Sequence, residues 1–285
     1  MNAQAKAKAQ ASHRDGPVRP SRLPLLRKAL VDARFSMGTW AVAMLAVMCL
    51  YLPLFPAIGG SDQMQQMLKA LPPKLVNALN YGQIASGPGY TQATVFGLLG
   101  FLLMTIMAVS AGAAAIGGDE ESGLLELTIA HGVTRTQVVL ERAAALVLRV
   151  AILHVFILIV LLVLKGPSEL GFDAAHAAAG VLMFALLVLL NGCFALLGGA
   201  LGGRKVHGIA AGAGVAVLGY AFNALGNQNP NLEWMHAVSP YYWAYGKSPL
   251  LNGVDAPAAL LLLGVSALCI ALAVAALHRR DIHGV

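Results

Sequence analysis

The chain has 285 residues, of which 58% are hydrophobic and 11% are charged, and its formal net charge is +6. A soluble domain carries about 25% charged residues, so this composition excludes an ordinary water-soluble globular protein and indicates a membrane protein. The apolar runs are long and do not alternate with polar residues, which favours membrane-spanning helices over strands.

The segment before the first apolar run is basic. Its Lys and Arg residues are Lys6, Lys8, Arg14, Arg19, Arg22, Arg27, Lys28 and Arg34. Residues 1–20 are rich in Ala, Gln, Lys, Ser, Gly and Pro and are expected to form a disordered tail. A basic tail beside a membrane span indicates contact with anionic lipid on the cytoplasmic side rather than with nucleic acid.

Residues 23–37 combine an apolar stripe with charged side chains on the other faces. This pattern predicts a short amphipathic elbow helix that lies on the inner leaflet before the first span. The alternative is that these residues are the polar start of the first span itself.

Six apolar segments are each long enough to cross a membrane core of about 30 Å, which needs about 20 residues of helix. The predicted spans are residues 39–58, 92–116, 138–164, 175–201, 207–225 and 257–277. The fifth is the weakest prediction, because it contains several glycines and Asn223. Glycine nevertheless allows close helix packing in a membrane, and the pairs Gly198/Gly202 and Gly208/Gly212 have the spacing for it.

The distribution of Lys and Arg predicts the orientation of the spans. With the N-terminus inside, the inside holds the basic tail together with Arg135, Arg142, Arg204, Lys205, Arg279 and Arg280. The outside then holds only Lys69, Lys74, Lys165 and Lys247. Both termini are therefore expected in the cytoplasm.

The cytoplasmic segment between the second and third spans has the sequence of a short helix. Gly117 and Gly118 are expected to end the second span, and Asp119–Glu121 to open a helix over residues 119–131, where acidic groups favour the positive end of the helix dipole. Gly132 can take the left-handed conformation that ends a helix. An acidic and apolar helix is suited to docking on a cytoplasmic protein. A helix lying on the bilayer is the alternative, which the negative inner leaflet disfavours.

The third span begins with a predicted capping box, formed by Thr134 and Gln137. Glu141 and Arg142 are close enough to the helix start to reach the inner interface. Arg149 lies deeper, and charges inside a span are costly. We therefore expect Arg149 to pair with an acid or a carbonyl, or to line a cavity.

No catalytic or metal site is expected in the chain. The histidines lack ligand spacing, and His154 is expected to be a hydrogen-bonded packing group, with a proton or substrate role as the alternative. Residues 198–205 are rich in glycine but lack the Gly-x4-Gly-Lys-Ser/Thr spacing of a phosphate-binding loop. The chain is therefore not expected to be an enzyme by itself.

The run of residues 120–127, followed by residues 130–135, resembles the conserved loop of ABC-2 type transporter permeases. That loop has an acidic pair, a Gly-Thr-Leu-Glu-Leu-Leu-like run and a Pro-Val-Ser-Arg-like turn. This chain has Leu124 where Thr is usual, Gly132 where Pro is usual and Thr134 where Ser is usual.

Two further stretches carry the same resemblance. Residues 67–73 and the pair Gly89-Tyr90 resemble the first external loop of permeases related to exporters of polyketide antibiotics. Residues 239–243 and 249–253 resemble the family's Ser-Pro-aromatic segment before the last span. The likeness covers most of residues 23–280 and implies one six-helix permease domain over residues 21–285.

In such permeases the acidic loop forms a coupling helix that docks in a groove of an ATP-binding subunit. The resemblance implies that the docking residues are Glu120, Glu121, Leu124, Leu125, Glu126, Ile129 and Arg135. ATP and Mg²⁺ would be bound by that partner, with no cofactor on this chain. The expected assembly contains two ATPase subunits and a second permease chain, which is expected to be a copy of this one.

On the outer side, residues 227–255 are expected to form a re-entrant segment of short helices that closes an external gate. The expected gate residues are Ser239, Pro240, Tyr241, Tyr242 and Trp243. The alternative is an aromatic belt at the outer interface. Residues 61–80 of the first external loop are expected to form two short amphipathic helices over the exit.

The function implied by the resemblance is the permease of an ATP-driven exporter in a bacterial plasma membrane, which acts by alternating access. An amphipathic drug-like or lipid-like substrate is expected, as in multidrug efflux and antibiotic resistance. The alternatives are export of a polysaccharide or lipid precursor, an intramembrane enzyme, or a membrane sensor that transports nothing.

Overall fold

The computed structural model describes residues 23–59, 61, 66, 70, 72 and 83–280, and this part of the chain is all-helical. It contains six helices long and apolar enough to cross a membrane, so the prediction of a six-span, all-helical membrane protein is confirmed, including the glycine-rich fifth span. These are Pro24–Ile58, Gly87–Glu121, Arg135–Leu164, Ala174–Gly202, Lys205–Gly226 and Ala256–Arg279. The predicted tail and most of the predicted outer-loop helices lie outside the described residues.

The first two spans are built from several consecutive helical elements. The first comprises α2 (Pro24–Tyr51), η1 (Leu52–Leu54) and α3 (Phe55–Ile58). The second comprises α6 (Gly87–Thr91), the π-helix η3 (Gln92–Leu99), α7 (Gly100–Ala113), the π-helix η4 (Ala114–Gly118) and α8 (Asp119–Glu121). Each π-helical turn holds one residue more than an α-helical turn.

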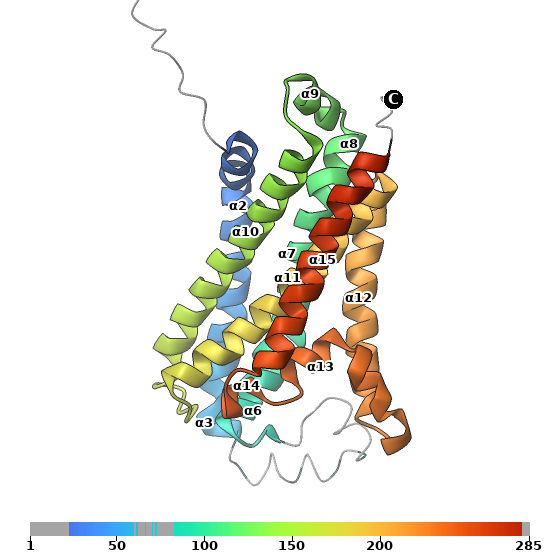
Figure 1. The fold of residues 1–285 in the computed structure, drawn as a ribbon. Coiled ribbons are helices and arrows are strands. Elements are labelled where there is room, and N and C mark those ends of the chain that lie inside the picture. Colours follow the sequence, from blue (N-terminus) through green and yellow to red (C-terminus); the bar gives the residue numbers. More distant parts are fainter. Residues whose placement is uncertain are drawn as a thin grey trace, which may run out of the picture.

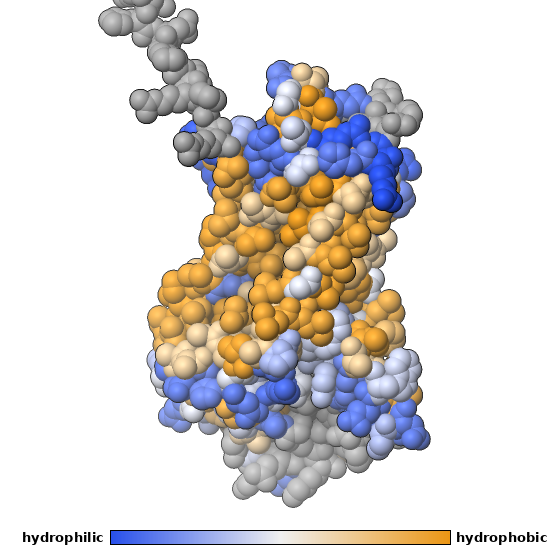
Figure 2. Space-filling view, in the orientation of Figure 1, coloured by the Kyte–Doolittle hydropathy of each residue, from blue (hydrophilic) through white to orange (hydrophobic). Residues whose placement is uncertain are grey.

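The other elements are single helices. They are α9 (Leu124–Ala130), α10 (Arg135–Leu164), α11 (Ala174–Gly202), α12 (Lys205–Gly226), the 3₁₀-helix η5 (Pro230–Val238), α13 (Pro240–Tyr245), α14 (Pro249–Asn252) and α15 (Ala256–Arg279). Figure 1 shows α9 and the start of α2 at one end of the bundle, together with the end of α15; α13 and α14 lie at the other end. We call these the α9 end and the α13 end. Figure 2 shows a broad apolar band between two polar ends, as a membrane requires.

The long helix α11 lies at the centre of the bundle and packs against α7, α10, α12 and α15. Small residues allow α12 to approach its neighbours closely. A Cβ atom on Gly208 would lie 2.7 Å from the Cα of Ala113, and one on Gly212 would lie 2.7 Å from the backbone oxygen of Asn191. The glycines that weaken the fifth span as a sequence signal therefore fix its position in the bundle.

The predicted elbow is not a separate helix. Residues 24–51 form one continuous α-helix of 28 residues, which agrees with the alternative that the amphipathic segment starts the first span. The helix contains no proline after Pro24, and its one glycine, Gly38, lowers helix propensity without interrupting the helix. At about 42 Å this helix is longer than the membrane core is thick, so its first turns extend beyond the hydrocarbon.

The prediction that Gly117 and Gly118 end the second span is wrong. The helix continues through both of them as η4 and ends after Glu121, at Gly123, whose φ of 71° is left-handed. Gly117 instead packs closely, because a Cβ there would lie 2.6 Å from the backbone of Arg204. The acidic residues therefore belong to the end of the second span and not to the following helix, α9.

At the start of the third span, only one half of the predicted capping box is formed. Gly132 has a φ of 84° after α9, and the Thr134 hydroxyl accepts a hydrogen bond from the backbone N–H of Gln137 at 3.2 Å. The reciprocal half of the capping box is not formed. The Gln137 side chain instead donates to Glu141 at 2.7 Å, one helical turn further on.

Candidate coupling and gating sites

Three successive acidic side chains at the end of the second span each pair with an arginine from a different part of the bundle. Asp119 pairs with Arg142 of α10. Glu120 pairs with Arg280, just after α15, at 2.7 Å, and Glu121 lies 3.8 Å from Arg204, just before α12. We call these three pairs the α9-end ion pairs. They connect the end of α8 to three other spans.

The α9-end ion pairs differ in exposure. The Glu120 side chain is 9% exposed, and its partner Arg280 also donates to the backbone oxygen of Ala200 at 2.8 Å. The Glu121 side chain is 41% exposed and its contact is longer. Exposed ion pairs contribute little to stability, whereas a shielded pair that is also hydrogen-bonded contributes more. Glu120 is thus directed into the protein rather than toward a cytoplasmic partner.

The helix α9 presents two different faces. Leu125 is buried and Ile129 half-buried against an apolar cluster that includes Val138. Leu124 and Leu127 are 44% and 59% exposed on the other side. Leu127 was not among the predicted docking residues, although its three-residue spacing from Leu124 places both on one face. Glu126 is half-buried and forms no ion pair with any described residue.

Arg135 hydrogen-bonds to the C-terminal end of α15. Its guanidinium donates to the backbone oxygens of Leu277 at 2.6 Å and Arg280 at 2.5 Å. The last carbonyls of a helix lack partners within the helix, so this arginine satisfies two acceptors at the helix end. The predicted docking residues therefore differ in placement: Leu124 is exposed on α9, Leu125 and Ile129 pack α9 against the bundle, and the charged residues before and after α9 contact other helices.

At the α13 end, α13 is fastened by hydroxyl groups. The Ser239 hydroxyl donates to the backbone oxygen of Gly219 in α12 at 2.6 Å and accepts from the backbone N–H of Tyr242 at 3.1 Å. Pro240 is buried at the first position of the helix. Ser239 thus caps α13 and joins it to α12 with a single side chain.

Two tyrosines of α13 are buried and bind the π-helix η3. The Tyr241 hydroxyl donates to the backbone oxygen of Gly97 at 2.8 Å, and the Tyr245 hydroxyl donates to that of Phe96 at 3.3 Å. Burial raises the pKa of the Tyr245 phenol well above its ordinary value, so it remains a donor at physiological pH. We call this set of contacts the α13 tyrosine clamp.

The remaining aromatic residues lie nearer the surface. Tyr242 stacks on His236 with ring centroids 3.8 Å apart, and the Trp243 indole donates to the backbone oxygen of Ala237 at 3.1 Å. Trp234 is 62% exposed, as an interfacial belt requires. The predicted gate residues are therefore brought together in one element, and Tyr245 belongs with them. An aromatic belt alone does not describe the segment, because Tyr241 and Tyr245 are in the core.

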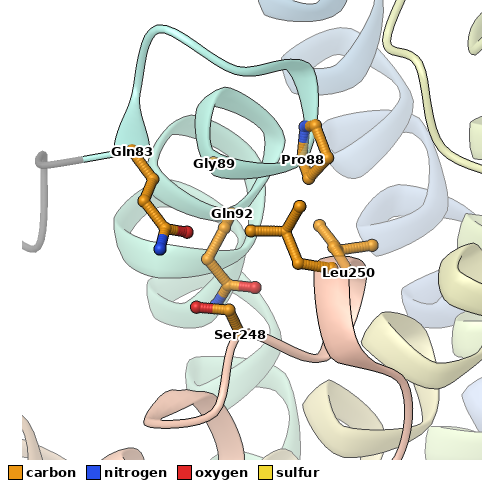
Figure 3. Close-up of a pocket in the computed structure, with 7 residues that line it drawn as sticks. Gln83, Pro88, Gly89, Gln92, Ser248 and Leu250 are labelled. Carbon is orange, nitrogen blue, oxygen red and sulfur yellow. The ribbon is translucent and has the colours of Figure 1, made fainter.

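A small cavity of about 10 Å³, with both polar and apolar lining, lies between α6, the start of η3 and α14 (Figure 3). Gln92, the first residue of η3, points toward Ser248, and neither its amide nitrogen nor its oxygen has a hydrogen-bond partner among the described residues. Ser248 has a φ of 49°, which is unusual for a residue other than glycine. From the sequence, Gln92 was predicted only to begin the second span, and no pattern indicated that its amide points into a cavity beside Ser248.

A larger cavity of about 460 Å³ lies between α7 and α12 and is almost entirely apolar. Its polar lining consists of hydroxyls such as those of Thr105 and Ser110. The Thr105 hydroxyl accepts a hydrogen bond from the Asn191 side chain at 3.3 Å. Large exposed side chains such as Leu102 and Val217 border it. Such a cavity suits an apolar molecule or the apolar part of an amphipathic one.

Histidines and cysteines do not gather into a site in the described part of the chain. His154 is buried, hydrogen-bonds to the backbone oxygen of Val150 at 2.8 Å and packs edge-on against Phe184. Among the described residues no three His, Cys, Asp or Glu side chains are placed to hold a metal ion.

Comparison with known proteins gives one match. A family model described as "ABC-2 family transporter protein" matches residues 23–282. Neither the curated proteins nor the solved structures that were searched contain a match. The family match covers all six spans, α9 and the segment from η5 to α14.

Proposed function

The chain belongs to the ABC-2 family of transporter proteins, and we propose that it is the permease of an ATP-driven exporter that moves an amphipathic, drug-like or lipid-like molecule out of the cytoplasm. Membership of the family implies a partner ATPase. The assembly we propose contains two ATPase subunits and two copies of this permease in a bacterial plasma membrane. ATP and Mg²⁺ are bound by the partner.

The observation that carries the proposal is the two-faced helix α9. It projects at one end of the bundle (Figure 1), with Leu124 and Leu127 exposed and Leu125 anchored in the core. An exposed apolar pair on a rigid short helix suits insertion into a groove of another protein. Leu124 and Glu126 then contact the ATPase, while Leu125 and Ile129 hold the helix in place.

The charged residues on either side of α9 transmit its movement to the spans. Glu120 and Glu121, at the end of α8, pair with Arg280 and Arg204, near the ends of α15 and α12. Arg135, the first residue of α10, holds the end of α15. A displacement of α9 by the ATPase therefore reaches several spans at once, as rigid-body alternating access requires. These residues are positioning residues for coupling rather than contacts with the ATPase.

The external gate is assigned to α13. Opening the α13 end requires α13 to separate from η3 and α12, which breaks the hydrogen bonds of Ser239, Tyr241 and Tyr245. These are neutral hydrogen bonds of ordinary strength, each contributing about 1 kcal/mol, so a conformational change can break them. Pro240, Tyr242 and Trp243 complete the gate element.

The nature of the substrate is supported by the 460 Å³ cavity between α7 and α12. Its apolar lining fits a hydrophobic or amphipathic molecule and offers few groups to bind a polysaccharide. The exposed apolar residues around it are also suited to contact a second permease chain, which would place the cavity between two copies.

The test is purification of the tagged, full-length chain from its native membranes in mild detergent, with ATP hydrolysis measured on the eluate. We expect an ATP-binding subunit in equal amount, and we expect its loss in the double variant Leu124→Asn, Leu127→Asn. Leu201→Asn, an exposed leucine at the end of α11, is the matched control and should retain the subunit.

Two results would count against the proposal. The first is a chain that purifies without any ATP-binding subunit. The second is equal retention of the ATPase in the α9 double variant and the control. Reversal of Glu120 and Glu121 to Lys is a less specific test, because it also breaks two of the α9-end ion pairs.

A further inference from the structure

Arg149 is a charged residue within the third span that forms no ion pair with a described acidic residue. One of its terminal nitrogens donates to the backbone oxygen of Ala29 in α2 at 2.6 Å. Its Nε is buried and has no hydrogen-bond partner among the described residues. A charge inside a span is costly unless something compensates it, and it often marks a functional site.

The depth of Arg149 in the membrane can be estimated along α10. Lys165 follows the other end of that helix, and the separation between the two residues corresponds to about 24 Å of helix axis. With Lys165 at the outer interface and α10 tilted (Figure 1), Arg149 lies in the half of a core about 30 Å thick that is nearer the α9 end. A long arginine side chain at this depth reaches the level of the lipid phosphates.

Two cavities adjoin Arg149 between α2, α7, η4 and α10. The first has a volume of about 110 Å³, and its polar lining is Asp119, Arg142 and Arg149. The second has a volume of about 200 Å³ and is lined by Arg149, the hydroxyls of Ser36 and Ser110, and apolar residues that include Trp40. Alanines from α2 and α7 leave this space open, because larger side chains there would fill it.

The acidic groups near this space are already engaged or lie outside it. Asp119 pairs with Arg142, and Glu141 accepts hydrogen bonds from the backbone N–H of Leu26 and from Gln137. Asp32, on α2 together with Lys28, is exposed and attracts Arg149 electrostatically, but it forms no ion pair with any described residue. No carboxylate among the described residues therefore contacts the Arg149 guanidinium directly, and its donors can bind a group that enters the cavity.

We propose that the cavity around Arg149 binds the phosphate group of a membrane phospholipid from the leaflet at the α9 end. A guanidinium presents several N–H donors and binds phosphate oxygens at two points. The hydroxyl of Ser36 supplies a further donor, and the apolar lining of the second cavity, which includes Trp40, suits the start of an acyl chain. A lipid is favoured over free phosphate, because lipid phosphates at the α9 end already lie within reach of a long arginine side chain and do not have to leave bulk water. The site does not depend on the transport activity.

The experiment is native mass spectrometry of the full-length protein in detergent, titrated with dioleoyl phosphatidylglycerol. We expect saturable binding to the wild-type chain, weakened about tenfold in Arg149→Gln because a charge-assisted hydrogen bond is lost. Arg204→Gln removes the same charge from an exposed arginine at the same end of the bundle and should bind as the wild type does.

A second variant tests the cavity without changing its charge. Ser36→Phe places a ring at an exposed position of α2 that borders the cavity, and it should weaken lipid binding as Arg149→Gln does. If Arg149→Gln does not accumulate in the membrane, Ser36→Phe alone tests whether the cavity binds the lipid. Equal binding of phosphatidylglycerol to the wild type and to the variants that accumulate would overturn the proposal. Displacement of the lipid by millimolar inorganic phosphate would overturn the assignment to a lipid.

Discussion

The two ends of the bundle are held together by different chemistry. At the α9 end, three acidic residues pair with arginines from three other spans, and the exposure of these acids ranges from shielded to open. At the α13 end, buried tyrosine hydroxyls bind backbone carbonyls of the π-helix η3. Ion pairs near water can exchange partners and are screened by salt, whereas buried neutral hydrogen bonds are little affected by salt. The difference fits the proposal that the α9 end docks a partner and that α13 forms a gate.

The largest effect is expected from removal of a whole ring from the α13 tyrosine clamp. Tyr241→Ala removes a buried ring that contacts Phe101, Tyr220 and Tyr245, and it leaves the carbonyl of Gly97 without its donor. We expect the free energy of unfolding to fall by about 3–5 kcal/mol, as for other buried aromatic truncations. Denaturant titration of the purified protein in detergent measures it.

The control for this prediction is Trp234→Ala, which removes a larger but exposed ring at the same end. Its effect should stay within about 0.5 kcal/mol, as for most surface changes. Similar losses in the two variants would mean that α13 is not packed into the bundle as described.

The next largest effect is expected at the α9 end, from Glu120→Gln. The change leaves the Arg280 guanidinium, which is 29% exposed, without its carboxylate. Loss of a fully buried ion pair costs about 3–5 kcal/mol and loss of an exposed one about 1 kcal/mol or less, so we expect about 2 kcal/mol here. The reversed pair Glu120→Arg with Arg280→Glu should recover part of the loss. No recovery would contradict direct pairing.

A smaller effect isolates the hydroxyl of the tyrosine clamp. Tyr241→Phe keeps the ring and removes one hydrogen bond, so we expect a loss of about 1 kcal/mol with no dependence on salt. Tyr245→Phe should lose less, because its bond to Phe96 is longer, at 3.3 Å. Unfolding titrations at low and high NaCl concentration compare the two. If the decrease in the free energy of unfolding of either variant depended strongly on salt, the two ends of the bundle would not differ in salt sensitivity as described.

The smallest effect is expected from Glu121→Gln. This carboxylate is exposed and lies 3.8 Å from Arg204, so its removal should change the free energy of unfolding by about 0.5 kcal/mol or less. The variant is also the matched control for Glu120→Gln, since the same charge is lost one residue away. An effect as large as that of Glu120→Gln would show that exposure does not set the strength of these ion pairs.

The sequence predicts the spans well because hydropathy depends on each segment by itself. It does not distinguish the two uses of glycine around the second span. Gly117 packs against another part of the chain, while Gly123 makes the turn. Both glycines lie where the sequence changes from apolar to polar. Only the three-dimensional position of Arg204 shows that Gly117 is needed for packing and Gly123 for the turn.

The partners of the site residues could not be predicted for a related reason. Glu120 and Arg280 are 160 residues apart in the chain, and the pattern around each of them contains no information about the other. The predicted docking set therefore grouped Glu120 with Leu124, although one points into the bundle and the other away. Tyr241 and Tyr245 lie in the segment predicted to be re-entrant, but their acceptors are carbonyls of η3, 144 and 149 residues earlier in the chain, which hydropathy does not reveal.

The pairing of Arg280 with Glu120 has a practical consequence for the handling of the protein. The guanidinium and the backbone oxygen of Arg280 both take part in contacts at the α9 end, so a truncation that removes Arg280 would break contacts with Glu120, Ala200 and Arg135 together. Shortened variants for assays of the α9 end should therefore retain Arg280.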